Sequence, residues 1–321
     1  MNDENATLGG TYYHVPSGYY YLTEDITLEH GLRITKSATV HIDLNGHTIT
    51  GSATNARPLF IQGNLRICDS SYDASKENKA EQFQGGIVAT RPTNFNLCYV
   101  SGEGFLRIFG GKFSTTVESV ERGIFGATGA IYVFDGYIKG ANATTGASVF
   151  ELHEGSKDDG LVSIYRATVE AGTAKYGGIV NMGGAEENFN FYSGKLIGTA
   201  VAGEGGVIYA SKGVVVIAGG TISGGSAIRG GNIFIGADAR LTVKGGEIIG
   251  GSAVGAASGT NGGGGNIYAA GNVTITGGTI SGGIASRTQA DAQAFCVVLI
   301  FTSIAKICVE YALANSRQRS S

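Results

Sequence analysis

The titratable residues of this sequence that could act together lie in one short stretch, "ELHEGSKDDG", at positions 151–160. Its titratable members are Glu151, His153, Glu154, Lys157, Asp158 and Asp159. Two adjacent aspartates could flank a Ca²⁺ ion, and a pair of carboxyl groups can serve as acid and base in the cleavage of a glycosidic bond. The candidate catalytic residues are therefore Glu151, His153, Asp158 and Asp159, and Ca²⁺ is the one cofactor that these residues suggest.

A solvated, charged loop tip is the alternative explanation of this stretch, and the pattern favours it. One loop does not make a catalytic site, and apart from Asp135 no facing carboxylate or arginine recurs on the neighbouring repeats. The sequence contains no phosphate-binding loop, no dinucleotide fingerprint and no paired histidines for a metal. We therefore expect no other cofactor.

The composition indicates many short strands joined by tight turns. The chain has 321 residues, of which 54 are glycine and 3 are proline, without the three-residue period of collagen. Apolar residues make up 42% and charged residues 15%, which argues against a disordered chain. The net charge of −3 gives no basic surface for nucleic acid, so nucleic acid is not an expected partner.

An internal repeat predicts the fold. The clearest copies are "GGVIYASKGVVVIAGGTISGG" from Gly205, "GGNIFIGADARLTVKGGEIIGG" from Gly230 and "GGNIYAAGNVTITGGTISGG" from Gly264. Weaker copies extend the repeat back to Leu59. Each copy holds three short apolar segments separated by glycine, and such a unit can bury its aliphatic side chains only by stacking on its neighbours.

We therefore expect an all-β protein, a right-handed parallel β-helix (a solenoid with three strands per coil), with about nine coils. It would form a single domain over residues 1–288. Within this domain we expect an N-terminal cap at about residues 1–35 and a polar insertion loop at residues 70–84.

Alignment of the copies predicts which side chains face inward. Two columns share one face of the second strand, because their members lie two residues apart. They are Leu65, Leu106, Ile131, Val162, Phe189, Val215, Leu241 and Val273, and Ile67, Ile108, Val133, Ile164, Phe191, Ile217, Val243 and Ile275. The first strand supplies Leu59, Cys98, Ile124, Val149, Val180, Ile208, Ile233 and Ile267. The third supplies Val88, Phe113, Ile138, Val169, Leu196, Ile222, Ile248 and Ile280.

The alternate positions would face solvent, and one such column is aromatic on consecutive coils. The candidate ligand-binding residues are Phe109, Phe134, Tyr165 and Tyr192 in that column, with Tyr132 and Arg107 beside it. An exposed aromatic column suits stacking on sugar rings or contact with a protein partner, unless the insertion loop covers it. A second column contains Phe60, Tyr99, Phe125, Phe150, Asn181, Tyr209, Phe234 and Tyr268. For this column the pattern favours packing over binding, because a bulge can invert the orientation of the strand and β-helices often stack aromatic rings inside.

The segments "LNGHTITG", "GGNIY…GNVTITGGTISGG" and "GNLRICDSS…GGIV" resemble the pectin-lyase-like parallel β-helix superfamily over about residues 20–283. They are most similar to glycine-rich repeats of bacterial surface and adhesin-type proteins. The resemblance is specific for the fold, because the superfamily contains both enzymes and non-catalytic adhesins. The regular coils, the exposed aromatic column and the lack of recurrent catalytic carboxylates favour a non-catalytic extracellular or cell-surface module whose partner is a polysaccharide or a host or cell-surface protein.

Two other functions stay open. One is a polysaccharide lyase or glycoside hydrolase, because hydrolases of this superfamily use clustered aspartates and its lyases pair Ca²⁺-binding carboxylates with an arginine or lysine base. The other is a purely structural stalk.

The two ends of the chain carry separate expectations. The first residues lack the basic-then-apolar pattern of a signal peptide, so an exported protein would need one that this chain does not include. Residues 289–321 break the repeat and predict an apolar helix, and residues 292–305 are uncharged, which falls short of the roughly 20 residues of a membrane span. A helical cap, a membrane anchor at residues 292–314 and a non-native tail are the three alternatives.

Overall fold

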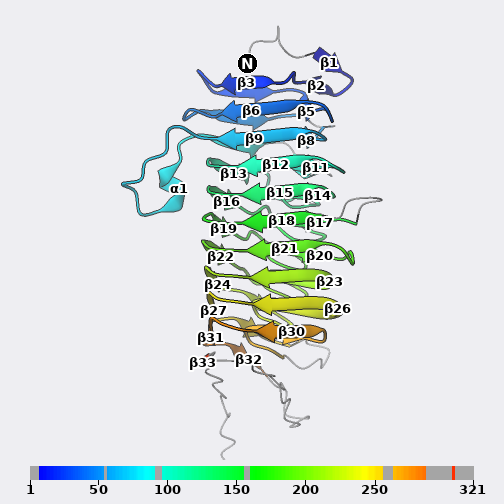
Figure 1. Ribbon diagram of the computed structural model, residues 1–321, viewed down its shortest axis with the longest axis vertical. Coiled ribbons are helices and arrows are strands. Elements are labelled where there is room, and N and C mark those ends of the chain that lie inside the picture. The colour runs from blue at the N-terminus through cyan, green and yellow to red at the C-terminus, as the bar shows by residue number, and fades with distance from the viewer. Residues whose placement is uncertain are drawn as a thin grey trace, which may run out of the picture.

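The computed structural model describes residues 7–53, 56–90, 96–154, 160–255, 263–286 and 306–307. The chain winds into stacked coils, and the strands of each coil pair in parallel with the equivalent strands of the next (Figure 1). The predicted all-β, parallel β-helical solenoid with three strands per coil is therefore confirmed. Residues 289–321, where we expected a helix, lie outside the described residues except for β33 (Lys306–Ile307). This short strand pairs with the third strand of the last coil.

The first strands of successive coils pair with one another in one continuous ladder. The second strands pair in the same way, and both sets belong to one sheet. The first strands are β2 (Tyr12–His14), β5 (Gly31–Ile34), β8 (Leu59–Ile61), β11 (Cys98–Val100), β14 (Phe125–Ala127), β17 (Phe150–Leu152), β20 (Val180–Met182) and β29 (Ile267–Ala269). The second strands are β3 (Gly18–Tyr21), β6 (Thr39–Asp43), β9 (Asn64–Cys68), β12 (Phe105–Ile108), β15 (Ala130–Val133), β18 (Leu161–Ile164), β21 (Asn188–Phe191) and β30 (Asn272–Ile275). Two long strands, β23 (Ile208–Ile217) and β26 (Ile233–Val243), cover both positions.

The third strands form an 11-stranded parallel sheet that includes β33. Its other members are β4 (Ile26–Leu28), β7 (Thr48–Gly51), β10 (Gly86–Ala89), β13 (Lys112–Thr115), β16 (Tyr137–Lys139), β19 (Thr168–Glu170), β22 (Lys195–Ile197), β24 (Thr221–Ser223), β27 (Glu247–Ile249) and β31 (Thr279–Ser281). A small sheet of β25 (Ser226–Ala227), β28 (Ser252–Ala253) and β32 (Ile284–Ala285) follows the third strand in the last coils.

Two further coils precede the first glycine-rich copy, made of β2–β4 and β5–β7. Much of the expected N-terminal cap is thus a coil in its own right. The strand β1 (Thr7–Gly9) pairs with β2 in the antiparallel direction at this end of the rod.

The second strands confirm both predicted inward columns. Leu65, Leu106 and Ile131, for example, lie in register on consecutive coils and are fully buried. Two aliphatic side chains on one strand must both point into the core. The sequence pattern therefore determines which residues of this strand face inward and which face outward. The residue after each second strand must therefore point outward.

The first strands correct the predicted alignment in two coils. Phe125 pairs with Cys98, and Phe150 pairs with Phe125, so these phenylalanines take the inward positions that we assigned to Ile124 and Val149. The two phenylalanine rings are fully buried and stack with their centroids 5.2 Å apart. Phe125 and Phe150 therefore pack inside, as the favoured interpretation of the second column predicts, whereas the assignment of Ile124 and Val149 to these register positions was wrong. The outward positions belong to the next residue of each strand, Gly126 and Glu151.

The third strands need one similar correction. Ile87, rather than Val88, lies in register between Ile49 and Phe113 and is fully buried. The rest of this column is as predicted.

Glycine is required at the corner that begins each of the clearest copies. Gly230 and Gly264 have φ angles of +63° and +64°, and a Cβ on either would lie about 2 Å from the carbonyl oxygen three residues later. Behind these corners, Asn232 and Asn266 are buried one above the other, and Nδ2 of Asn232 donates to Oδ1 of Asn266 at 2.8 Å. The pattern "GGN" thus supplies both a tight turn and a buried hydrogen-bonded asparagine ladder.

Candidate functional site

The predicted aromatic column exists and faces outward. Its members lie directly after the ends of the second strands β12, β15, β18 and β21. They are Phe109, Phe134, Tyr165 and Tyr192, which we call the aromatic ladder. The backbone of the strands sets their spacing, because Phe109, Phe134, Tyr165 and Tyr192 each donate a backbone hydrogen bond to the coil before, at 2.8–2.9 Å. The two end rings are the most exposed, 36% at Phe109 and 42% at Tyr192.

The rings of the aromatic ladder lie face to face. Successive centroids are 4.7, 4.9 and 4.7 Å apart, and the interplanar angles are 10°, 14° and 9°. Each inner ring therefore has both faces covered by its neighbours and presents its edge to solvent. The surface that a partner would meet is a ridge of ring edges with the hydroxyl groups of Tyr165 and Tyr192, because sugar stacking on the inner ring faces would require the rings to separate.

Arg107 and Tyr132 lie beside the aromatic ladder on β12 and β15, as predicted from their column. They are register partners, and Cζ of Arg107 lies 5.8 Å from the Tyr132 ring centroid. At the N-terminal end of the ladder, Cζ of Arg66 lies 4.7 Å from the Phe109 ring centroid. The structure thus brings all six predicted ligand-binding residues onto one outer surface, with guanidinium groups at one end.

The insertion loop packs beside the aromatic ladder rather than over it. It carries the one α-helix of the described residues, α1 (Lys79–Gln82), and folds back along the rod (Figure 1). Lys79 Nζ lies 2.7 Å from Asp135 Oδ1, and the buried Phe83 ring packs where Gly110 leaves room for it. These contacts fall at the corner that follows the ladder, and the end rings keep the exposure given above.

Two of the four candidate catalytic residues, Glu151 and His153, are described, and they lie on β17 and directly after it. Glu151 lies in β17 and is only 6% exposed, whereas His153 is half-buried and Glu154 exposed just after that strand. Asp158 and Asp159 lie outside the described residues. Glu151 is therefore a strand residue enclosed by the protein, which the expected loop position did not anticipate.

The carboxyl group of Glu151 is held by its own coil and the next. One oxygen accepts from the backbone N–H of Ala147, and Oε2 accepts from Nδ2 of Asn181 at 2.9 Å. Gly146 is needed here, because a Cβ at that position would overlap the carboxylate. Burial raises the pKa of Glu151 to about 7, although the hydrogen bonds from Asn181 and Ala147 and the charge of Arg122 favour the ionised form.

The C-terminal part of the second outward column faces out but is covered. Tyr209, Phe234 and Tyr268 stack with centroids 5.2 and 5.3 Å apart. Arg229 lies over Phe234 and Tyr268 and is bonded to Glu204, so Phe234 is only 7% exposed. These rings serve packing.

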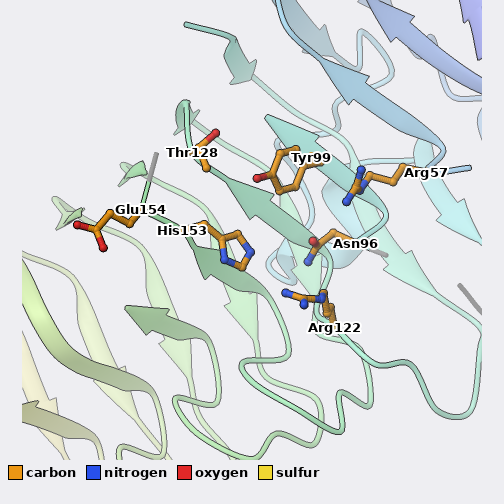
Figure 2. A pocket seen from close by; sticks show the side chains of 7 residues that line it. All are labelled: Arg57, Asn96, Tyr99, Arg122, Thr128, His153 and Glu154. Atoms are coloured by element: carbon orange, nitrogen blue, oxygen red, sulfur yellow. The ribbon is translucent and has the colours of Figure 1, made fainter. Parts of the chain in front are cut away.

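The N-terminal part of the same column contains a hollow of about 400 Å³ that the sequence pattern did not predict (Figure 2). Its lining residues are Arg57, Asn96, Tyr99, Arg122, Thr128, His153 and Glu154. Arg57, Asn96 and Arg122 come from the connections that lead into β8, β11 and β14. Thr128, His153 and Glu154 come from the segments that leave β14 and β17. Figure 2 shows Asn96, Arg122 and His153 converging beside the Tyr99 ring.

Gly126 lies against two of the residues that line the hollow, Asn96 and Tyr99. Its register partners in the adjacent coils are Tyr99 and Glu151, so Gly126 is the one position of this series without a side chain. A Cβ there would lie 2.4 Å from Asn96 Oδ1 and 2.7 Å from Tyr99 Cδ2. Correct alignment of the first strands would have placed this glycine in the outward column and marked the break.

Within the described residues, no group of three or more histidine, cysteine, aspartate or glutamate side chains could hold a metal ion. No helix in the described part of the chain has the length and apolar character needed to cross a membrane. Comparison with protein-family models, curated proteins and solved structures gave no match for this chain.

Proposed function

We propose that this protein is a non-catalytic, adhesin-like module of the cell surface or extracellular space, which presents a rigid face for carbohydrate or protein binding. The observation that carries the proposal is the aromatic ladder: four rings in register on consecutive coils, partly exposed and flanked by Tyr132 and Arg107. The resemblance to glycine-rich repeats of the pectin-lyase-like superfamily, and of bacterial surface proteins within it, agrees with such a role.

The stacked coils suit a binding surface because they hold it in place before a partner arrives. Each ring is positioned by a β-strand whose neighbours on both sides are paired, so little conformational entropy is lost on binding. Aromatic edges and tyrosine hydroxyl groups offer apolar contact and hydrogen bonds together, which is the chemistry of many recognition surfaces. Carbohydrate is the first partner to test, because its hydroxyl groups complement Tyr165, Tyr192 and Arg107.

An enzymatic role finds less support among the described residues. Glycoside hydrolysis needs two accessible carboxyl groups about 5–10 Å apart. Glu151 is enclosed, and Asp135, which lies next to Phe134, is bound to Lys79 at 2.7 Å and faces Arg166 at 3.8 Å. A carboxylate paired in this way is poorly placed to transfer a proton.

A structural stalk is the second candidate, and the face-to-face stacking favours it. Rings that cover one another stabilise the rod without any partner, by about 0.5–1.5 kcal/mol per pair beyond the area they bury. The two functions predict different results when an exposed ring is removed. A binding module loses affinity for its partner, whereas a stalk has no such affinity to lose.

A glycan array separates the two. The wild-type chain is compared with Tyr165→Ala and Tyr192→Ala, and the exposed Tyr21, at the N-terminal end of the rod, is replaced by alanine as the control. A binding module should retain glycan recognition in the control and lose about tenfold or more in affinity in each ladder variant. Circular dichroism confirms folding of each variant. Absence of any glycan ligand, or equal binding by all four proteins, would refute the carbohydrate-binding role of the ladder.

A further inference from the structure

The hollow lined by Asn96, Tyr99 and Arg122 has the chemistry of a site for a small anion. We propose that it binds a compact organic carboxylate that carries an N–H or O–H donor next to its charged group, such as an amido- or hydroxy-carboxylate. The site lies on the first strands, whereas the aromatic ladder follows the second strands, so the proposal does not depend on the ladder's function.

The lining residues include two arginines. Arg57 and Arg122 contribute two guanidinium groups, and the exposed Glu154 contributes the one carboxylate among the lining residues. Arg122 lies 3.9 Å from Glu121, and both side chains are about 40% exposed, so this ion pair is weak. Arg122 therefore keeps most of its ability to attract a second anion.

The pKa of His153 depends on its burial and on the two arginines. Burial, together with the charges of Arg122 and Arg57, lowers the pKa of its imidazole. The ring is consequently neutral near pH 7 and offers one donor and one acceptor nitrogen. A neutral histidine adds no positive charge of its own and can donate its N–H to an anion that Arg122 attracts.

Asn96 supplies an acceptor that the protein does not use. The residue is 1% exposed, and its Nδ2 donates to the Gly123 carbonyl at 3.0 Å. Its Oδ1 atom is buried and accepts no hydrogen bond within the protein, and Asn96 is one of the residues that line the hollow. A buried acceptor without a donor costs about 1–3 kcal/mol, so a ligand that brings an N–H or O–H group recovers that energy.

These groups together define the ligand. A guanidinium group binds a carboxylate through two parallel hydrogen bonds, which favours a planar carboxylate over a spherical anion. The donor of the ligand meets Asn96 Oδ1, and its apolar part meets the Tyr99 ring. A volume of about 400 Å³ matches a single small molecule rather than a polymer segment.

The first experiment is isothermal titration calorimetry of the full chain with defined probes. N-acetylglycine and glucuronate each combine a carboxylate with a donor, their methyl esters lack the charge, and sulfate lacks the donor. We expect saturable binding of at least one carboxylate, and binding of its ester and of sulfate weaker by about tenfold or more. Preference for N-acetylglycine identifies an amido-carboxylate ligand, and preference for glucuronate identifies a hydroxy-carboxylate.

Variants then locate the binding. Arg122→Gln removes the charge. Gly126→Ala, at a glycine whose φ angle is not positive, adds a methyl group that would overlap Asn96 and Tyr99 and so displace two residues that line the hollow. Each should weaken carboxylate binding by about tenfold or more, whereas Arg240→Gln, at an exposed arginine on β26, should not. Tyr192→Ala should also leave this binding unchanged, which separates the hollow from the ladder.

The proposal is overturned if no probe saturates, if sulfate or a methyl ester binds as tightly as its carboxylate, or if Arg122→Gln and Gly126→Ala both bind like the wild type.

Discussion

Replacement of Glu151 by glutamine should make the protein more stable at neutral and alkaline pH. The carboxyl group is 6% exposed, and burial raises its pKa from 4.5 to about 7. The folded state therefore holds this proton more tightly than the unfolded state. Linkage then requires that the free energy of unfolding falls as the pH rises from about 4.5 to about 7, and stays lowered above that.

The magnitude follows from the size of the shift. A change from 4.5 to about 7, at about 1.4 kcal/mol per pH unit, corresponds to about 3 kcal/mol. Glutamine keeps the oxygen that accepts from Ala147, and the half-exposed Asn181 can turn its own oxygen toward the new amide group. We expect Glu151→Gln to exceed the wild type by about 3 kcal/mol at pH 8 and to be about equal to it near pH 4.5.

The assay is urea unfolding of both proteins at several pH values between about 4.5 and 8.5, with the difference in unfolding free energy plotted against pH. The difference cancels the contribution of His153, whose lowered pKa removes stability as the pH falls below 6.5. Glu103→Gln, at an exposed glutamate, is the control and should give a small, nearly constant difference. A flat difference for Glu151→Gln, or a loss of stability at pH 8, would show that the buried carboxyl group does not carry this cost.

Two further substitutions test how the scaffold is held together. Asn232→Ala should destabilise the fold by about 2–4 kcal/mol in urea unfolding, because it leaves buried backbone and amide groups without partners. The same change at the exposed Asn272 should cost about 0.5 kcal/mol or less, and equal effects at the two positions would contradict the asparagine ladder. Lys79→Met removes the contact with Asp135 that anchors the insertion loop, so limited proteolysis should cut this loop faster than in the wild type or in the exposed-site control Lys76→Met. Unchanged cleavage would mean that other contacts anchor the loop.

The second strands show what the sequence was able to predict. Pairs such as Leu106 and Ile108 lie two residues apart on every coil, and only one orientation buries both. Once the inward-facing residues are known, the outward direction of Phe109 and its counterparts follows from the alternation of side chains along a strand. The aromatic ladder was therefore predictable to the residue, but its face-to-face stacking was not, because ring orientation depends on side-chain packing between coils.

The first strands show where the pattern becomes ambiguous. Ile124 and Phe125 are both buried, as are Val149 and Phe150, so alternation alone does not tell which residue of each pair belongs to the strand's inward column. These strands are three residues long and contain one aliphatic position in register. Choosing the earlier residue shifted the alignment by one in these two coils, so Phe125 rather than Gly126 was assigned to the outward column.

The hollow could not have been predicted from any local motif, because its lining comes from separate turns of the rod. Arg57, Asn96 and Arg122 meet only after three coils are stacked in register. Their spacing in the sequence reflects the lengths of the connecting loops, which vary between coils. Long-range strand pairing, rather than residue type, brings this chemistry together.

In a solenoid, a break in a column is as informative as the column itself. Each outward position is repeated along the rod, so a side chain normally has a neighbour above and below that covers it, as in the aromatic ladder. When one member is glycine, the neighbouring groups lose that cover and turn toward the gap, as Asn96 and Tyr99 do at Gly126. Regular stacking therefore holds the rod together, and the position that lacks a side chain is where Asn96 and Tyr99, two residues of the proposed anion site, approach the strand backbone.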